Sequence, residues 1–122
     1  MTLQEIADKL VAICKAGQEA TNLDLLYHPD AISIEAADHS GKGRETKGLD
    51  GIRGKHAWWE ANFAVHSSAV EGPFLHGDDQ FAVIFQIDAT EKATGQRMAM
   101  REVAVYHVAA GKIVKEAFYG MG

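Results

Sequence analysis

Apolar positions follow a helical spacing near the start of the chain and alternate through its second half. Thr2 and Glu5 form the Thr-x-x-Glu pattern of a helix N-terminus, and an apolar stripe follows them. The pattern predicts an amphipathic helix over about residues 3–19, packed on a sheet. A second, short helical piece must end near His28, because Pro29 disfavours helix in the residue before it.

The middle of the chain changes period twice. Residues 31–36 alternate and are rich in β-branched side chains, which predicts a short strand. Residues 37–48 are polar, contain three glycines and show no period, which predicts either a binding loop or a surface insertion. Helical spacing returns over about residues 50–63, where one face holds Ile52, His56, Trp59 and Phe63.

From Val65 onward the sequence alternates in four runs separated by turn residues, which predicts an antiparallel meander of four strands. Gly72 and Pro73 predict a bend inside the first of these strands, because proline cannot donate to a sheet ladder. In the third run, Glu102 stands on a face that is otherwise mostly apolar. A carboxylate is costly to bury, so Glu102 is a candidate for a functional role.

The length of 122 residues fits one domain that spans residues 1–122. The net charge is -5 and no basic cluster occurs, which argues against nucleic acid as a partner. The single cysteine, Cys14, lies among apolar residues and is interpreted as a small buried side chain. The first residues lack a signal-peptide pattern and no run reaches the length of a membrane helix, so we expect a cytoplasmic protein without a membrane partner.

The order of these elements, together with the segments LYHPDAISIE, GLDGIRGKHAWW and GKIVKEAFY, resembles the nuclear transport factor 2-like superfamily. This superfamily includes ketosteroid isomerases and SnoaL-like polyketide cyclases. The resemblance implies an α+β, cystatin-like fold: a curved mixed or antiparallel sheet and about three N-terminal helices form a cone with an internal pocket. It also implies a homodimer formed through the outer sheet face, where Val103 and Val105 supply apolar surface.

Residue matching separates this chain from the ketosteroid isomerases, in which a carboxylate base acts together with a protonated carboxylic acid. The resemblance places Glu35 at the position of the base. Leu10 and Ala104 replace the two residues that hold the oxyanion, so steroid isomerisation is not expected. Simple alternation instead turns Ile32 and Ile34 inward and Glu35 outward, so the direction of Glu35 stays open.

Proton transfer within an apolar pocket is the chemistry that these polar positions suggest. Two inward carboxylates would repel each other and lose solvation, which raises at least one pKa toward neutrality. The candidate catalytic residues are Glu102, Glu35, His56, Glu116 and Tyr106. In the alternative interpretation, Glu102 and Glu116 form ion pairs at the rim of the sheet with Arg97, Arg101 or Lys115.

Aromatic residues and methionines supply the candidate pocket wall, although the same residues can also simply fill a core. The candidate ligand-binding residues are Tyr27, Trp59, Phe63, Phe85, Met98, Met100 and Phe118. The histidines are scattered, and His76 to Asp79 is typical of a hairpin turn, so no metal site is predicted. No nucleotide-binding or nucleophile motif is present, and no cofactor is predicted.

Two functions remain open at this point. The first is a cofactor-independent isomerase, cyclase or dehydratase that acts on a small apolar or polyketide-like molecule through carboxylate and histidine proton transfer. The second is a non-catalytic module of the same fold that binds a ligand or forms a dimer. The missing oxyanion residues favour the second function, whereas the polar residues on apolar faces favour the first.

Overall fold

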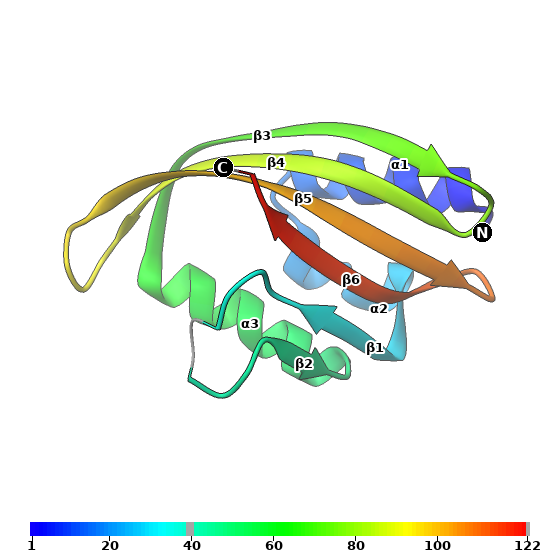
Figure 1. The fold of residues 1–122 in the computed structure, drawn as a ribbon, viewed down its shortest axis with the longest axis horizontal. Helices are drawn as coiled ribbons and strands as arrows, with labels where there is room; N and C mark the ends of the chain where they lie inside the picture. The colour runs from blue at the N-terminus through cyan, green and yellow to red at the C-terminus, as the bar shows by residue number, and fades with distance from the viewer. Residues whose placement is uncertain (39–40, 122) are drawn as a thin grey trace.

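The computed structural model describes residues 1–38 and 41–121. Helices lie on one side of a curved, unclosed sheet (Figure 1). The helices are α1 (Leu3–Lys15), the 3-10 helix η1 (Glu19–Thr21), α2 (Leu23–Leu26) and α3 (Leu49–Asn62). The strands are β1 (Tyr27–Ile34), β2 (Glu45–Lys47), β3 (Phe63–His76), β4 (Gln80–Glu91), β5 (Arg97–Ala109) and β6 (Lys112–Gly120).

The strand order of the described sheet is β2-β1-β6-β5-β4-β3. Neighbouring strands are antiparallel except β1 and β6, which run parallel, so the sheet is mixed. The predicted fold class, an α+β cystatin-like fold with a curved mixed sheet, is confirmed. None of the helices in the described part of the chain has the length and apolar character that a bilayer-spanning segment requires.

The predicted N-terminal helix is confirmed, and it begins as the sequence pattern indicates. The Thr2 hydroxyl accepts a hydrogen bond from the Glu5 N–H at 3.2 Å, and the Glu5 carboxylate accepts one from the Thr2 N–H at 3.0 Å. The helix ends at Lys15, earlier than the predicted residue 19, and Gly17 follows with a φ of 67°. Its apolar stripe packs against β3 and β4.

The region around Pro29 differs from the prediction. The second helix ends at Leu26, and β1 begins at Tyr27 instead of near Ala31. Pro29 therefore lies inside a strand, where the pairing of β1 with β6 shifts register between Tyr27 and Ile32. Its missing N–H is tolerated there because the ladder is already interrupted.

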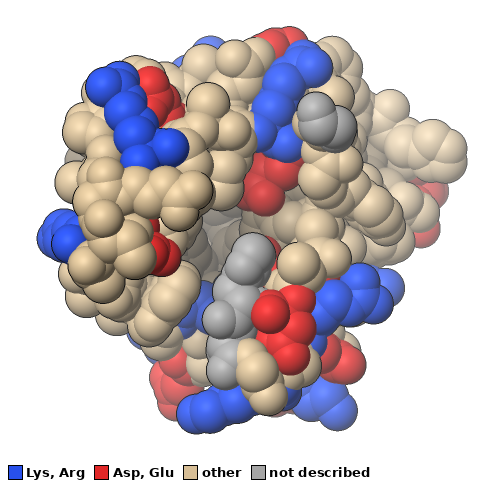
Figure 2. Space-filling view, turned by 60° about the vertical axis from the view of Figure 1, so that its left-hand side comes forward, with Lys and Arg blue, Asp and Glu red and all other residues tan. Residues whose placement is uncertain are grey.

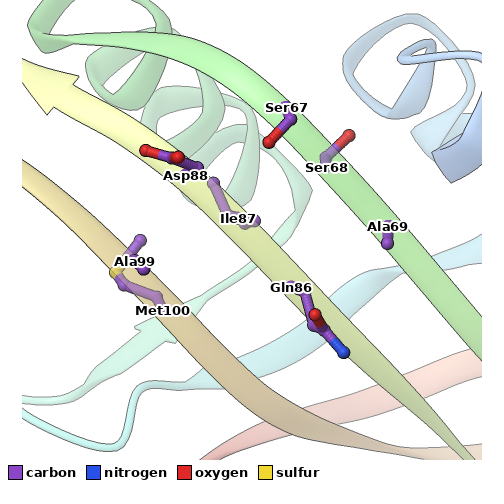
Figure 3. A pocket seen from close by; sticks show the side chains of 8 residues that line it. All are labelled: Ser67, Ser68, Ala69, Gln86, Ile87, Asp88, Ala99 and Met100. Carbon is purple, nitrogen blue, oxygen red and sulfur yellow. The ribbon is translucent and has the colours of Figure 1, made fainter.

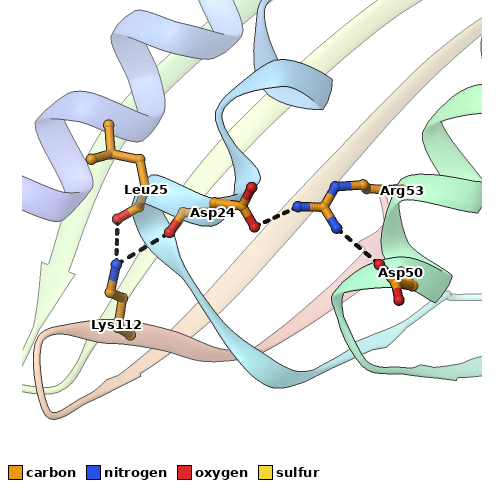
Figure 4. Close-up of polar contacts among 5 residues, drawn as sticks. All are labelled: Asp24, Leu25, Asp50, Arg53 and Lys112. Carbon is orange, nitrogen blue, oxygen red and sulfur yellow. Dashed lines mark hydrogen bonds and ion pairs between the residues drawn. The ribbon is translucent and has the colours of Figure 1, made fainter.

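Polar contacts fix α2 between α3 and the turn that precedes β6 (Figure 4). The Arg53 guanidinium pairs with Asp24 of α2 and, within its own helix, with Asp50 at 2.9 Å. The Lys112 ammonium donates to the carbonyl oxygens of Asp24 and Leu25 at 3.2 and 2.8 Å. Lys112 thus satisfies carbonyl groups at the end of a very short helix.

The meander agrees with the prediction, including its bend. The pairing of β3 with β4 shifts register between Glu71 and Phe74, on either side of Gly72 and Pro73. The predicted third helix is also confirmed, with α3 covering residues 49–62. The polar loop contains one element that the pattern does not predict, the short strand β2, which pairs with β1.

The two faces of the meander differ in burial. Phe81, Val83, Ala104 and Tyr106 are almost fully buried on the face that the helices cover. They define the inner face, on which Glu102 and Glu116 also lie by strand register. The opposite, outer face carries Phe74 and Tyr119, with exposed fractions of 51% and 57%.

Candidate functional site

The most deeply buried ionisable carboxylate in the described structure belongs to Glu116 of β6, which is 4% exposed. Strand register places Glu116 between Ser33 of β1 and Tyr106 of β5. The Ser33 hydroxyl donates a hydrogen bond to Glu116 Oε2 at 3.3 Å. Oε1 has no partner within hydrogen-bond distance among the described residues.

Burial raises the pKa of Glu116, because the charged form loses its hydration. The neighbouring Tyr27 opposes this shift most strongly, and Lys55 and Ser33 oppose it as well. In the same environment, burial and the nearby Glu116 carboxylate raise the pKa of Tyr27 well above its ordinary value. An under-satisfied buried carboxylate of this kind is costly and is therefore a marker of a functional site.

The position of Ser33 corrects one expectation about β1. Ala31 and Ser33 are buried, whereas Ile32 and Ile34 are partly exposed, so the expectation that the isoleucines face inward is wrong. Alternation does not say which parity faces the interior, and here the smaller side chains occupy the face toward Glu116. Glu35 has the parity of Ser33, which agrees with the direction that the family resemblance implies.

Lys55 of α3 connects these groups. Its ammonium forms an ion pair with Glu35 and donates a hydrogen bond to Ser33 Oγ at 2.6 Å. The same nitrogen lies 5.4 Å from the ring centroid of Phe118. Lys55 thus extends from α3 to the sheet and places a positive charge beside Glu35 and Ser33.

Glu102 of β5 stands opposite Phe85 in the β4–β5 ladder and is partly buried. Burial raises its pKa from 4.5 to about 7; the Glu35 and Glu116 carboxylates add to the shift and Lys55 opposes it. No ion pair joins Glu102 to any residue that the structure describes.

The arginines that could have paired with the inner carboxylates pair elsewhere. Arg97 binds both carboxylate oxygens of Asp88 at 2.9 Å, and Arg101 lies 3.8 Å from Glu71. These pairs lie at the rim or on the outer face. Among the described residues, neither Glu102 nor Glu116 forms the ion pair with Arg97, Arg101 or Lys115 that the rim interpretation requires.

His56 and Tyr106 occupy different surroundings. Burial, and then the charge of Lys55, lower the pKa of His56, and Glu60 and Glu35 partly offset that effect. Tyr106 is 2% exposed and stacks on Phe81 with ring centroids 4.8 Å apart. Burial and Glu116 raise the pKa of Tyr106 well above its ordinary value, so its hydroxyl keeps its proton.

The predicted ligand-binding residues divide into two groups. Tyr27, Phe85 and Phe118 lie beside the carboxylates, as described above. Trp59 and Phe63 stack on each other with centroids 4.2 Å apart, at the junction of α3 and β3. Met98 and Met100 lie farther along β5, opposite Ala89 and Ile87 of β4.

Two open hollows occur elsewhere on the described surface. One, of about 250 Å³, lies along β3, β4 and β5 (Figure 3) and is lined by Ser67, Ser68, Ala69, Gln86, Ile87, Asp88, Ala99 and Met100. The other lies near Arg53 and the start of α3. Met100 is the only predicted site residue that lines either of them. From the side on which the β4–β5 turn projects, the surface is hollowed near its middle, with acidic side chains at the edge (Figure 2).

Sequence reasoning missed Ser33 and Lys55. Ser33 was predictable: if Glu35 faces inward, as the resemblance implies, Ser33 lies two positions earlier and must face the same way. Lys55 carried a weaker signal, because it follows the buried Ile52 by three positions and so lies near the buried stripe of the helix. An isolated lysine on a helix is usually solvated, and only the packing of α3 on β1 gives it a role.

Comparison with known proteins agrees with this architecture. Residues 1–120 match the family model of the SnoaL-like domain. A SnoaL-like polyketide cyclase candidate from Mesorhizobium loti is 41% identical, with 98% of this chain and 99% of that chain covered and a TM-score of 0.90. No curated protein matches the chain.

More distant structures share the fold. An NTF2-like protein from Burkholderia thailandensis is 19% identical, with 99% of this chain and 92% of that chain covered and a TM-score of 0.83. A hypothetical protein with a ketosteroid isomerase-like fold from Catenulispora acidiphila, solved in complex with trimethylamine, is 19% identical, with coverages of 98% and 86% and a TM-score of 0.72. With its match to the family model over nearly its full length, the chain belongs to the SnoaL-like domain family.

Proposed function

We propose that this SnoaL-like domain is a small-molecule enzyme, a cofactor-independent isomerase, cyclase or dehydratase, in which Glu102 acts as the base. One observation carries the proposal. Glu102 lies on the inner face without an ion pair among the described residues, and its pKa is about 7. At neutral pH such a carboxyl can both accept and return a proton, which is the property that general acid–base catalysis requires.

The proposed chemistry acts on a small apolar or polyketide-like molecule that contains a carbonyl group. The Glu102 carboxylate removes a proton from the carbon next to the carbonyl, and the C–H electron pair moves to form an enolate. Glu102, now protonated, returns the proton to another atom of the ligand in an isomerisation. In a cyclisation, the enolate carbon attacks a second carbonyl of the same molecule, and the resulting alkoxide takes the proton. No net proton or electron is consumed in either case.

Other residues have supporting roles in this proposal. The protonated Tyr106 is a potential hydrogen-bond donor to the enolate oxygen, and the buried Glu116 pairs with it across the β5–β6 ladder. Phe85 and Phe118 supply apolar surface beside Glu102 and Lys55. Glu35 and His56 border the same group of charges and are candidates for proton exchange with solvent.

Hydrogen–deuterium exchange tests the proposal without knowledge of the product. A panel of small 1,3-dicarbonyl and polyketide-like ketones is incubated with the protein in D2O, and NMR follows the loss of the proton next to the carbonyl. We expect catalysed exchange that speeds up as the pH rises through about 7, because the ionised form of Glu102 is the base. Glu102→Gln should slow exchange by about 100-fold or more.

Glu71→Gln is the matched control, because Glu71 lies on the outer face near Arg101. It should exchange ligand protons at the rate of the unmodified protein. Equal rates for Glu102→Gln and the unmodified protein would remove Glu102 as the base. No exchange of any panel member above buffer would favour the second function, a binding module.

The binding module is supported by the absence of the family's oxyanion residues at Leu10 and Ala104. Its ligand would be held by the same apolar and acidic inner surface. Because the Catenulispora acidiphila protein was solved with trimethylamine, that amine belongs in a ligand screen for this chain. Chemical-shift changes at Phe118 or Glu102 without proton exchange would identify the module. We also propose that the chain forms a homodimer through the outer sheet face, as argued below.

A further inference from the structure

Lys55 donates the first of two successive hydrogen bonds that lead to Glu116. Its ammonium donates to Ser33 Oγ at 2.6 Å, and the Ser33 hydroxyl donates onward to Glu116 Oε2 at 3.3 Å. The ion pair with Glu35 holds the other side of the ammonium. The Lys55 and Glu35 side chains are 28% and 30% exposed, whereas Glu116 is buried. The two hydrogen bonds therefore connect partly solvated groups to a buried carboxylate.

The charged groups around Lys55 come from every element packed there. Glu35 follows β1, Glu102 lies on β5 and Glu116 on β6, while His56 and Glu60 lie on α3 with Lys55 itself. Lys55 is the cation that lowers the pKa of Glu102 and of Glu116. It is also the charge that adds to burial in lowering the pKa of His56.

We propose that Lys55 is a positioning residue for the interior carboxylates: through its ion pair with Glu35 and its hydrogen bond to Ser33, it sets how many protons Glu102 and Glu116 hold. Three carboxylates share this region, and burial raises the pKa of the two inner ones. A positive charge held at the helix–sheet junction favours their ionised forms and so opposes that rise. Lys55 acts on the ligand only through these carboxylates and does not itself accept or donate the reacting proton.

The functional importance of Lys55 rests on the proposed role of Glu102 as a base. The test of the positioning role, however, measures the titration of the carboxyl groups directly. Carbon-13 NMR of glutamate carboxyl groups and proton NMR of the His56 ring give a titration curve for each group. In Lys55→Met, we expect the pKa of Glu102 to rise by about one pH unit or more, so that its ionised fraction at pH 7 falls from about a half to about a tenth. Glu116 and His56 should shift upward as well.

Two further variants separate charge from shape. Lys55→Arg keeps a cation and should restore most of the ionisation of Glu102. Lys115→Met removes a positive charge from the residue next to Glu116 but on the opposite face of β6, and it should leave the titration of Glu102 unchanged. A folded Lys55→Met variant with unchanged curves for Glu102 and Glu116 would overturn the proposal.

If Lys55→Met does not fold, Lys55→Gln provides the second test, because it removes the charge and keeps a side chain that can still donate to Ser33 Oγ. We expect the pKa of Glu102 and of Glu116 to rise in this variant as well; unmoved titrations of both carboxylates would overturn the proposal. Shifted titrations together with absent proton exchange would leave the positioning role intact and reject the enzyme. Unshifted titrations with active exchange would do the reverse.

Discussion

Glu102 and Glu116 share the inner face of one sheet, yet their neighbours make them chemically different. Glu116 is enclosed and accepts a hydrogen bond from Ser33, whereas Glu102 is less deeply buried and has no ion pair in the described structure. Both have a raised pKa, for which burial is the largest cause. The difference suits Glu102 better than Glu116 to proton exchange with a ligand.

The raised pKa of Glu102 predicts a pH-dependent stability. Its ordinary pKa of 4.5 becomes about 7 in the folded protein, so the folded state binds this proton more tightly than the unfolded state does. The stabilisation is therefore present at low pH, is lost as the pH rises from about 4.5 to about 7, and is worth at most about 3 kcal/mol. Glu102→Gln should flatten this loss when the free energy of unfolding is measured by urea denaturation between about pH 5 and pH 8.

The same variant should be the more stable protein at about pH 8 and should differ little from the parent at about pH 5. Part of the pH dependence will persist, because Glu116 remains and its pKa is also raised. Glu71→Gln, about half exposed on the outer face, is the control and should follow the parent curve. A Glu102→Gln variant that does so too would contradict the burial argument.

Among the elements, α3 carries Lys55 and His56 to the sheet, and its two interior glycines test how tightly it is held. A Cβ at Gly51 would lie 2.8 Å from Thr46 Cγ2 of β2, whereas a Cβ at Gly54 would meet nothing within 4 Å. Alanine gains about 0.5–1 kcal/mol over glycine in a helix. Gly54→Ala should therefore stabilise the protein by about that amount, measured by thermal or urea unfolding.

In Gly51→Ala, the steric clash with Thr46 should cancel the gain in helix stability. This variant should therefore be less stable than Gly54→Ala by about 1 kcal/mol. Adding Thr46→Ser, which removes the methyl group, should return the double variant to within about 0.5 kcal/mol of Gly54→Ala. Equal stability of the two single alanine variants would show that β2 moves freely from α3.

The elements differ in how far sequence reasoning could define them. The meander strands are long and alternate, so their number and the bend at Gly72 were predictable. The strand β2 has three residues, too few to show a period, and the inward face of β1 stayed open because alternation does not say which parity faces the interior. Glu102 stood out as a charge on an apolar face, whereas the role of Lys55 depends on contacts between segments distant in sequence.

At the scale of the whole molecule, the helices cover one face of the sheet, and no described helix packs on the other face (Figure 1). Strand register lines up Phe74, Ala82, Val105 and Ala117 in one row across β3, β4, β5 and β6 on this outer face. The next row contains Glu71, Ile84, Val103 and Tyr119. The apolar residues of these two rows adjoin one another, with Glu71 at their edge, and such a surface favours association; a second copy of the chain offers the same surface in a two-fold arrangement.

We therefore expect a homodimer in solution, with the mass of two chains in size-exclusion chromatography with light scattering at micromolar concentration. Phe74→Asp combined with Tyr119→Asp should reduce the mass to that of one chain, because two carboxylates would be buried in each half of the interface. Both side chains are about half exposed in the single chain, so the variant should keep the circular dichroism of the parent. Val65→Asp, at a similarly exposed residue that pairs with the buried Ala89 of the inner face, should leave the mass unchanged. A parent protein that stays monomeric under these conditions would show that the outer face does not form a dimer.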